Sequence, residues 1–197
     1  MFSIHVYYRY RELILSMVKT DLKTRYRNSA LGFLWSFMNP LLTTAVLVFV
    51  FTSVFNIQIE NYPLFLLSGM IGWRFFSYTN ATMRSVKGNA GLIRKMRFPR
   101  EILVFSSCAS GLVTAIIEFT ILFLFAIAMG GNITFWVLAL PPVLAFQFVL
   151  VLGVSLGLSA LFVYYRDREQ IWDVVLRAGF FATPIIYRSA SISPSSH

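Results

Sequence analysis

Long apolar stretches separated by short loops are the feature that most constrains this chain. Apolar residues make up 57% of its 197 residues and charged residues only 13%, against about 25% charged residues in a typical soluble protein. About twenty apolar residues cross the hydrocarbon core of a bilayer as a helix. The sequence therefore predicts one all-α domain, a polytopic membrane helical bundle with about five transmembrane helices, at residues 34–55, 62–80, 102–129, 135–165 and 171–187.

Basic residues fall in alternate loops of this pattern. Six Lys or Arg precede the first predicted span and six lie between the second and third, whereas residues 56–61 and 130–134 contain none. Loops rich in Lys and Arg stay in the cytoplasm, so we expect a multi-pass protein of the cytoplasmic (inner) membrane with a cytoplasmic N-terminus. This bias and anionic membrane lipids account for the net charge of +9, and no nucleic acid partner is expected.

Residue types used in catalysis and metal binding are sparse. Cys108 is the only cysteine, and His5 and His197 lie at opposite ends of the chain, so no metal-ligand spacing is present. The sequence also lacks G-x-x-x-x-G-K-[ST], the loop that cradles the phosphates of ATP. We therefore predict no catalytic, metal-binding or cofactor-binding residue. A membrane-embedded enzyme is disfavoured because the eight acidic residues are scattered.

Residues 1–28 are predicted to form an amphipathic helix on the membrane surface. At 100° per residue, the polar side holds Glu12, Ser16, Lys19, Thr20, Lys23 and Arg27, and the apolar side holds Tyr10, Ile14, Leu15, Val18, Leu22 and Tyr26. Asp21 and Arg25 fall on the apolar side, where their i, i+4 spacing allows an ion pair. The alternative is a solvated helix with no partner beyond lipid.

The loop at residues 88–100 is both basic and apolar. A short helix is predicted at residues 90–98, because Pro99 disfavours helix at the residue before it. Leu92, Ile93 and Met96 would lie on one side of this helix, with basic residues around the rest. Such a segment is suited to docking into a cytoplasmic partner. The alternative is a simple positive-inside anchor.

Four charged residues lie inside predicted spans, where charge is costly and is usually functional: Asp173 and Arg177 in the last span, and Arg74 and Glu118 in the second and third. Arg74 and Glu118 are 12 and 11 residues from the outer ends of their spans at Tyr62 and Met129. At about 1.5 Å rise per residue, both lie roughly 17–18 Å from those ends. We therefore predict that they pair across the second and third spans or face a pore together.

Several motifs carry a resemblance that extends in order from about residue 13 to residue 187. They are residues 21–40 (DLKTRYRNSALGFLWSFMNP), 62–65 (YPLF), 72–76 (GWRFF), 89–95 (NAGLIRK), 98–102 (FPREI), 165–167 (YRD) and 183–187 (TPIIY). In these motifs the chain resembles the permease subunits of ABC-2 type polysaccharide exporters, which export O-antigen, capsular polysaccharide or teichoic acid. Residues 1–187 would then form one ABC-2 type transmembrane domain.

The resemblance implies partners and roles for several segments. The loop at residues 88–100 would be the coupling helix that docks into a separate ATPase, which would carry the ATP and Mg²⁺, and the chain would form a homodimer that exports a lipid-linked polysaccharide. The ATPase-coupling residues would be Leu92, Ile93, Arg94, Lys95, Met96, Arg97, Phe98, Pro99, Arg100 and Glu101. The cytoplasmic interface would include Asp21, Lys23, Arg25, Arg27, Arg166 and Asp167. For the last two, a solvated turn is an equal alternative.

Aromatic residues make up 17% of the chain and are frequent in the first two spans. Some of them are ordinary lipid-facing or interfacial residues. In an exporter of this kind, one stripe would line a channel in which sugar rings slide over aromatic faces. The candidate intramembrane residues are Trp35, Tyr62, Trp73, Phe75 and Phe76, together with Arg74 and Glu118.

Residues 188–197 form a short, Ser-rich polar tail that cannot span a membrane. Proteins of the resembled family continue at this point with short gate helices and a sixth span. We therefore expect a chain shortened at its C-terminus. An ABC-2 permease for a drug or another lipid, and a shortened product without transport activity, are the alternative functions.

Overall fold

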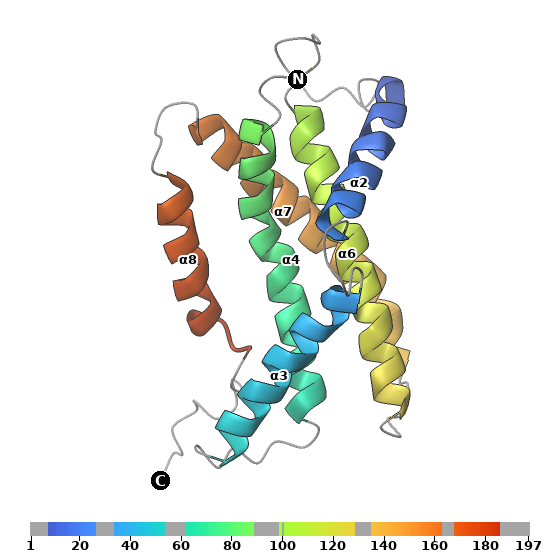
Figure 1. The fold of residues 1–197 in the computed structure, drawn as a ribbon, viewed down its shortest axis with the longest axis vertical. Helices are drawn as coiled ribbons and strands as arrows, with labels where there is room; N and C mark the ends of the chain where they lie inside the picture. The colour runs from blue at the N-terminus through green and yellow to red at the C-terminus, as the bar shows by residue number, and fades with distance from the viewer. Residues whose placement is uncertain are drawn as a thin grey trace.

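The computed structural model describes residues 8–26, 34–53, 62–88, 99, 101–128, 135–162 and 168–185. Within these ranges the chain is helical and contains no strand (Figure 1). The elements are α2 (Arg11–Tyr26), α3 (Trp35–Ser53), α4 (Tyr62–Gly88), α6 (Glu101–Ala128), the 3-10 helix η2 (Phe135–Ala139), α7 (Leu140–Phe162) and α8 (Arg168–Ala182). The predicted all-α class is confirmed.

The helix α4 is the centre of the bundle. It packs against α3, α6, α7 and α8, and its most extensive contact is with α6. Figure 1 shows α8 on one side of α4 and α6 on the other. The approach of α4 to α6 is close at Gly111, where an added Cβ would lie 2.8 Å from the ring of Tyr78. A glycine at this position lets the two helices meet, as small residues do in membrane bundles.

Two apolar clusters hold α4 in place. Near the middle of the helix, Phe75 packs with Val104 and Cys108 of α6 and with Val151 of α7. Near its first turn, Tyr62 and Leu66 pack with Met70 and Ile185. Together with the partly buried residues around them, these clusters tie α4 to α3, α6, α7 and α8. The Cys108 thiol is part of this core and is free of any disulfide.

Two described helices are long and apolar enough to cross a membrane. The windows Glu101–Ile127 and Val137–Leu161 have mean hydropathies of 2.2 and 2.3. The second window covers η2 and most of α7, and it exposes large apolar side chains such as Phe146 and Val149. Such a surface is compatible with lipid and not with water. The helices α3, α4 and α8 also occupy predicted spans, and their crossing of the membrane stays a prediction.

The helix ends differ from the predicted spans at identifiable residues. The helix α4 begins at Tyr62 but continues to Gly88, beyond residue 80. Pro141 and Pro142 lie in the first turn of α7, where the missing N–H costs no helical hydrogen bond. The helix α8 begins at Arg168, before residue 171. The predicted short helix at 90–98 and the tail at 188–197 lie outside the described residues.

The helix α2 packs along the first half of α6 (Figure 1). Its Ile14 is 8% exposed and contacts Ile102 and Leu103 of α6. The sequence predicted that the apolar side of this helix would rest in lipid, but protein covers part of it, while Leu15 remains exposed. The difference arises because helical periodicity identifies an apolar side without identifying what covers it.

Candidate functional site

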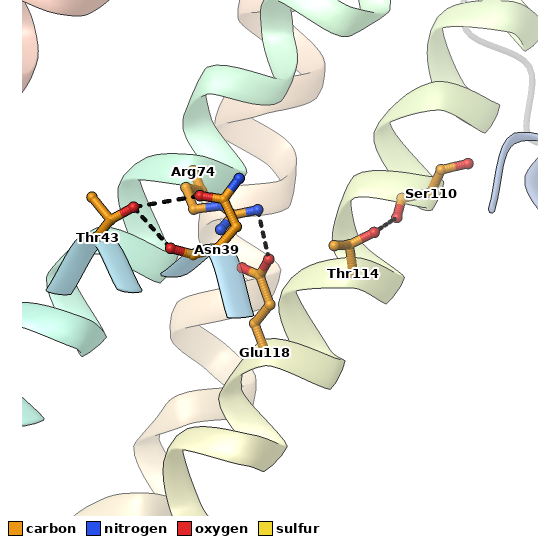
Figure 2. A network of polar contacts seen from close by, with 6 residues as sticks. All are labelled: Asn39, Thr43, Arg74, Ser110, Thr114 and Glu118. Carbon is orange, nitrogen blue, oxygen red and sulfur yellow. Dashed lines mark hydrogen bonds and ion pairs between the residues drawn. The ribbon is translucent and has the colours of Figure 1, made fainter. Parts of the chain in front are cut away.

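An ion pair lies between α4 and α6. Arg74 Nη2 is 3.1 Å from Glu118 Oε1 (Figure 2), and the side chains are 36% and 4% exposed respectively. The predicted pairing of these two residues across the second and third spans is confirmed. Equal helical depth was a sufficient signal, because two helices that pack side by side bring residues of equal depth together.

The exposure of the two partners differs, and this sets their energetics. Glu118 is almost wholly buried, so its carboxylate depends on protein groups for compensation. Arg74 is about one-third exposed, so protein encloses its guanidinium less completely. Glu118 therefore depends on the ion pair for compensation of its charge more than Arg74 does.

Two small cavities border Glu118. One of about 30 Å³ is lined by polar groups that include Arg74, Tyr78 and Thr114. The other, of about 10 Å³, brings Pro40 and Leu41 of α3 next to the same carboxylate. A polar cavity of the larger size can hold a water molecule, which needs about 10–15 Å³. Residues of α3 and α4 therefore line cavities beside Glu118, together with residues of its own helix.

A row of polar side chains runs along α6 and ends at Glu118. Ser106, Ser110, Thr114 and Glu118 follow one another at four-residue intervals and are all buried. The hydroxyl of Ser110 donates to the carbonyl of Ser106 at 3.1 Å, and that of Thr114 donates to the carbonyl of Ser110 at 2.9 Å (Figure 2). These bonds satisfy the hydroxyl protons within the helix and leave oxygen lone pairs available on its α4 side.

A second polar cluster, between α4 and α8, was not predicted. Arg84 of α4 contacts Glu169 at 2.6 Å and Asp173 at 3.7 Å. Asn80 donates a hydrogen bond to Asp173. We call this group, together with the hydrogen bond from Trp172 Nε1 to Thr79 Oγ1 at 2.9 Å, the α4–α8 clamp. In the sequence, this clamp is indicated only by the i, i+4 spacing of Glu169 and Asp173 in α8. No local rule connects these two acids to Arg84, which is far away in the chain.

The candidate channel aromatics do not share one face. Trp73 and Phe76 face α8, where Trp73 contacts Phe180 at a ring separation of 6.0 Å. Phe75 faces the opposite way, is 2% exposed and belongs to the core with α6 and α7. Tyr62 is buried in the cluster at the start of α4, and Trp35 is 49% exposed. These five aromatic residues therefore lie on different sides of the bundle, and which of them line a transport path stays a prediction.

The predicted cytoplasmic residues are only partly described. Lys23 is exposed, and Asp21 is half-buried against α6. Pro99 is exposed, and Glu101 is an exposed acid in the first turn of α6, where it favours the helix N-terminus. The side chain of Arg25 and the residues Leu92, Ile93, Arg94, Lys95, Met96, Arg97, Phe98, Arg100, Arg27, Arg166 and Asp167 lie outside the described part. Their proposed roles stay predictions.

The described residues contain no group of side chains suited to holding a metal ion. In those ranges, no three His, Cys, Asp or Glu side chains gather in one place. The acids of the α4–α8 clamp number two and are compensated by Arg84. The chemistry that the described site offers is therefore ion pairing and hydrogen bonding between helices.

The fold and the ion pair define an all-helical membrane protein with a charged contact inside its bundle. The chain belongs to the ABC-2 type transporter family, whose profile matches residues 12–196. The predicted family is therefore confirmed.

Its relatives include polysaccharide permeases. The chain is 34% identical over 190 residues to the O-antigen export system permease protein RfbA of Myxococcus xanthus, covering 96% of this chain and 73% of the relative. The match to a protein of the same name from Klebsiella pneumoniae is 35% over 185 residues, covering 92% and 71%. The match to the capsule polysaccharide export inner-membrane protein CtrC of Neisseria meningitidis is 26% over 175 residues, covering 84% and 64%.

Proposed function

We propose that this chain is the membrane-spanning permease subunit of an exporter that moves a lipid-linked polysaccharide across the cytoplasmic membrane. The similarity to O-antigen export permeases over more than nine-tenths of the chain carries this proposal. The charged contact at Arg74 and Glu118 inside an apolar bundle is consistent with transport, because charges within membrane spans usually mark functional positions. An ABC-2 permease for a drug or another lipid is the alternative.

Complementation tests the proposed substrate. A strain that lacks its own O-antigen permease but retains the cognate ATPase would receive this chain, and surface polysaccharide would be measured by immunoblotting. We expect polysaccharide at the surface and a fall in the lipid-linked polymer retained in the cytoplasm. Unchanged surface polysaccharide with a correctly inserted chain, together with increased efflux of a drug or lipid, would favour the alternative.

We further propose that ATP is hydrolysed on a partner subunit that docks at residues 88–100. The sequence lacks a phosphate-binding P-loop, and this loop combines three apolar with several basic residues. Co-purification tests the docking: Leu92→Asp and Met96→Asp should reduce recovery of the ATPase, whereas Glu12→Gln should not. Equal recovery with all three variants would contradict docking at this loop.

Orientation and assembly are parts of the same proposal. The distribution of basic residues supports a cytoplasmic N-terminus, and a homodimer would supply a second copy to enclose the transport path. Glu12 is exposed, so a cysteine introduced there by Glu12→Cys should react with an impermeant maleimide only in inside-out vesicles. Labelling of intact right-side-out vesicles would reverse the orientation. Cross-linking in the membrane, followed by mass measurement, tests the homodimer.

A further inference from the structure

A cavity of about 370 Å³ lies between α2, the end of α4 and the first half of α6. One water molecule occupies about 30 Å³ in the liquid, so the cavity has room for a group of several heavy atoms. Of the ten described residues that line it, seven are Ser or Thr, two are apolar, and Asp21 is the one charged residue. A polar cavity of this size in an apolar bundle calls for a polar occupant.

Beside the apolar contact of Ile14 with α6, the part of α2 that borders the cavity is mainly polar. Ser16, Thr20, Asp21 and Thr24 line the cavity, although Ser16 and Thr20 were predicted to belong to the side facing water. The floor is formed by Ser106, Ser107 and Ser110 of α6, which are all buried, whereas the three hydroxyl residues of α2 are exposed and form the rim. The cavity is therefore open along α2 and closed by α6.

Four of the hydroxyl groups around the cavity donate hydrogen bonds to backbone carbonyls of their own helices. Thr20 and Thr24 donate to backbone carbonyls one turn earlier at 2.8 and 2.7 Å. Ser106 and Ser110 donate to carbonyls of α6 at 3.0 and 3.1 Å. A hydroxyl that donates in this way keeps two acceptor lone pairs. The cavity wall therefore offers mainly acceptors and calls for an occupant that donates.

The carboxylate adds negative charge to this acceptor-rich wall. Asp21 Oδ2 is buried and receives no hydrogen bond from the described residues. A buried carboxylate oxygen without a hydrogen bond is costly, and a cationic donor, either Arg25 one turn along α2 or a bound cation, would remove that cost. The same carboxylate repels anions, so a phosphate group is disfavoured as the occupant of the cavity itself.

The cavity extends inward from the headgroup region of one leaflet. The 28 residues of α6 span about 42 Å, against about 30 Å for the hydrocarbon core. If the excess is shared between the ends, about 6 Å of α6 projects at its start. Ser106 and Ser110 lie about 7.5 and 13.5 Å along the helix from Glu101, which places Ser106 near the border between headgroups and acyl chains and Ser110 about 7.5 Å inside it.

We propose that this cavity binds a primary ammonium group, with the carboxylate of Asp21 as its counter-ion and the Ser and Thr oxygens as acceptors. An ammonium carries three N–H donors, as a lysine side chain does. A trimethylammonium group carries none, and the ten lining residues include no aromatic ring to receive it by cation–π contact. The ammonium can come from an ethanolamine lipid headgroup or from a soluble amine. The inference does not depend on the exported substrate.

Lipid retention tests the site with the full chain. The protein would be reconstituted in nanodiscs of phosphatidylcholine and phosphatidylglycerol that contain increasing phosphatidylethanolamine, and the lipid retained after extraction would be measured by native mass spectrometry. We expect at least a tenfold preference for phosphatidylethanolamine over phosphatidylcholine. Asp21→Asn should abolish the preference, whereas Glu12→Gln, which removes an exposed carboxylate from the same helix, should leave it unchanged.

A lipid series keeps the test independent of how well the variant folds. Retention by the unaltered chain should fall stepwise from ethanolamine to its mono-, di- and trimethylated headgroups as N–H donors are lost. Binding of free ethanolamine that requires Asp21, without discrimination among the lipids, would assign the same site to a soluble amine. Equal retention across the series with no binding of ethanolamine, or equal loss in the Asp21 and Glu12 variants, would overturn the proposal.

Discussion

The contact between Arg74 and Glu118 makes an asymmetric prediction for stability. In Arg74→Gln, a carboxylate that is 4% exposed loses its cationic partner, and removing one partner of a buried ion pair costs about 3–5 kcal/mol. In Glu118→Gln, the charge that remains is on Arg74, which is 36% exposed and so less enclosed by protein. The cost should then be closer to that of one hydrogen bond to a charged group, about 1.5–3 kcal/mol.

The free energy of unfolding of the full chain measures both costs. It would be obtained by titrating a denaturing detergent into mixed micelles and following tryptophan fluorescence. The double variant should be more stable than the sum of the single losses predicts, with a coupling energy between about 0.5 and 3 kcal/mol. Lys19→Gln, which removes an exposed cation from α2, is the matched control and should change stability by less than about 0.5 kcal/mol.

Two results would refute this reasoning. If the losses of the two single variants simply add in the double variant, the residues do not interact energetically. If Glu118→Gln destabilises the chain more than Arg74→Gln does, burial of the carboxylate is not the deciding factor. Transport would be measured alongside, because a variant that keeps its stability but loses export would show a role for the ion pair beyond packing.

Three further predictions concern helix contacts. Gly111→Ala should destabilise the chain by about 1–3 kcal/mol, because the new Cβ would lie 2.8 Å from the ring of Tyr78. Gly153→Ala, whose Cβ would have nothing within 4 Å, should not destabilise it, and thermal unfolding compares the two variants. Cys108 is fully buried, so maleimide should label it only after denaturation, and rapid labelling of the native chain would contradict its place in the core. Arg84→Gln should lower the free energy of unfolding by less than about 1 kcal/mol, because the arginine is 59% exposed. The same variant should increase disulfide trapping between cysteines introduced in shifted registers of α4 and α8, and unchanged trapping would argue against a clamp.

The sequence predicted the features that depend on distance along a helix. Apolar length identified the helices, and equal depth predicted that Arg74 would meet Glu118. Both inferences hold because a membrane fixes the direction in which helices run. The family followed from ordered motifs, and the profile match confirms it.

The features that depend on which way a helix faces were not predictable. In a membrane span nearly every side is apolar, so periodicity did not separate Trp73 and Phe76, which face α8, from Phe75, which faces the core. In α2 the Ser and Thr stripe was assigned to water, because an amphipathic pattern does not distinguish water from a polar cavity. The contact of Arg84 with α8 joins helices distant in the chain, and only tertiary packing decides it.

Close packing and polar contacts join α4 both to α6 and to α8. Lipid tails are as apolar as most of these side chains, so helix association in a membrane rests on close packing and polar contacts. The helices α4 and α6 have both, because an added Cβ at Gly111 would lie 2.8 Å from the ring of Tyr78 and the ion pair of Arg74 and Glu118 lies one to two turns away. The helix α8 also meets α4 closely, because an added Cβ at Gly179 would lie 2.8 Å from the ring of Trp73. Of the polar contacts between α4 and α8, the ion pairs of Arg84 are exposed and contribute little, whereas the hydrogen bond from Trp172 ends on Thr79, which is fully buried. Close packing at Gly179 and this hydrogen bond therefore hold α8 against α4 more than the ion pairs of the clamp do.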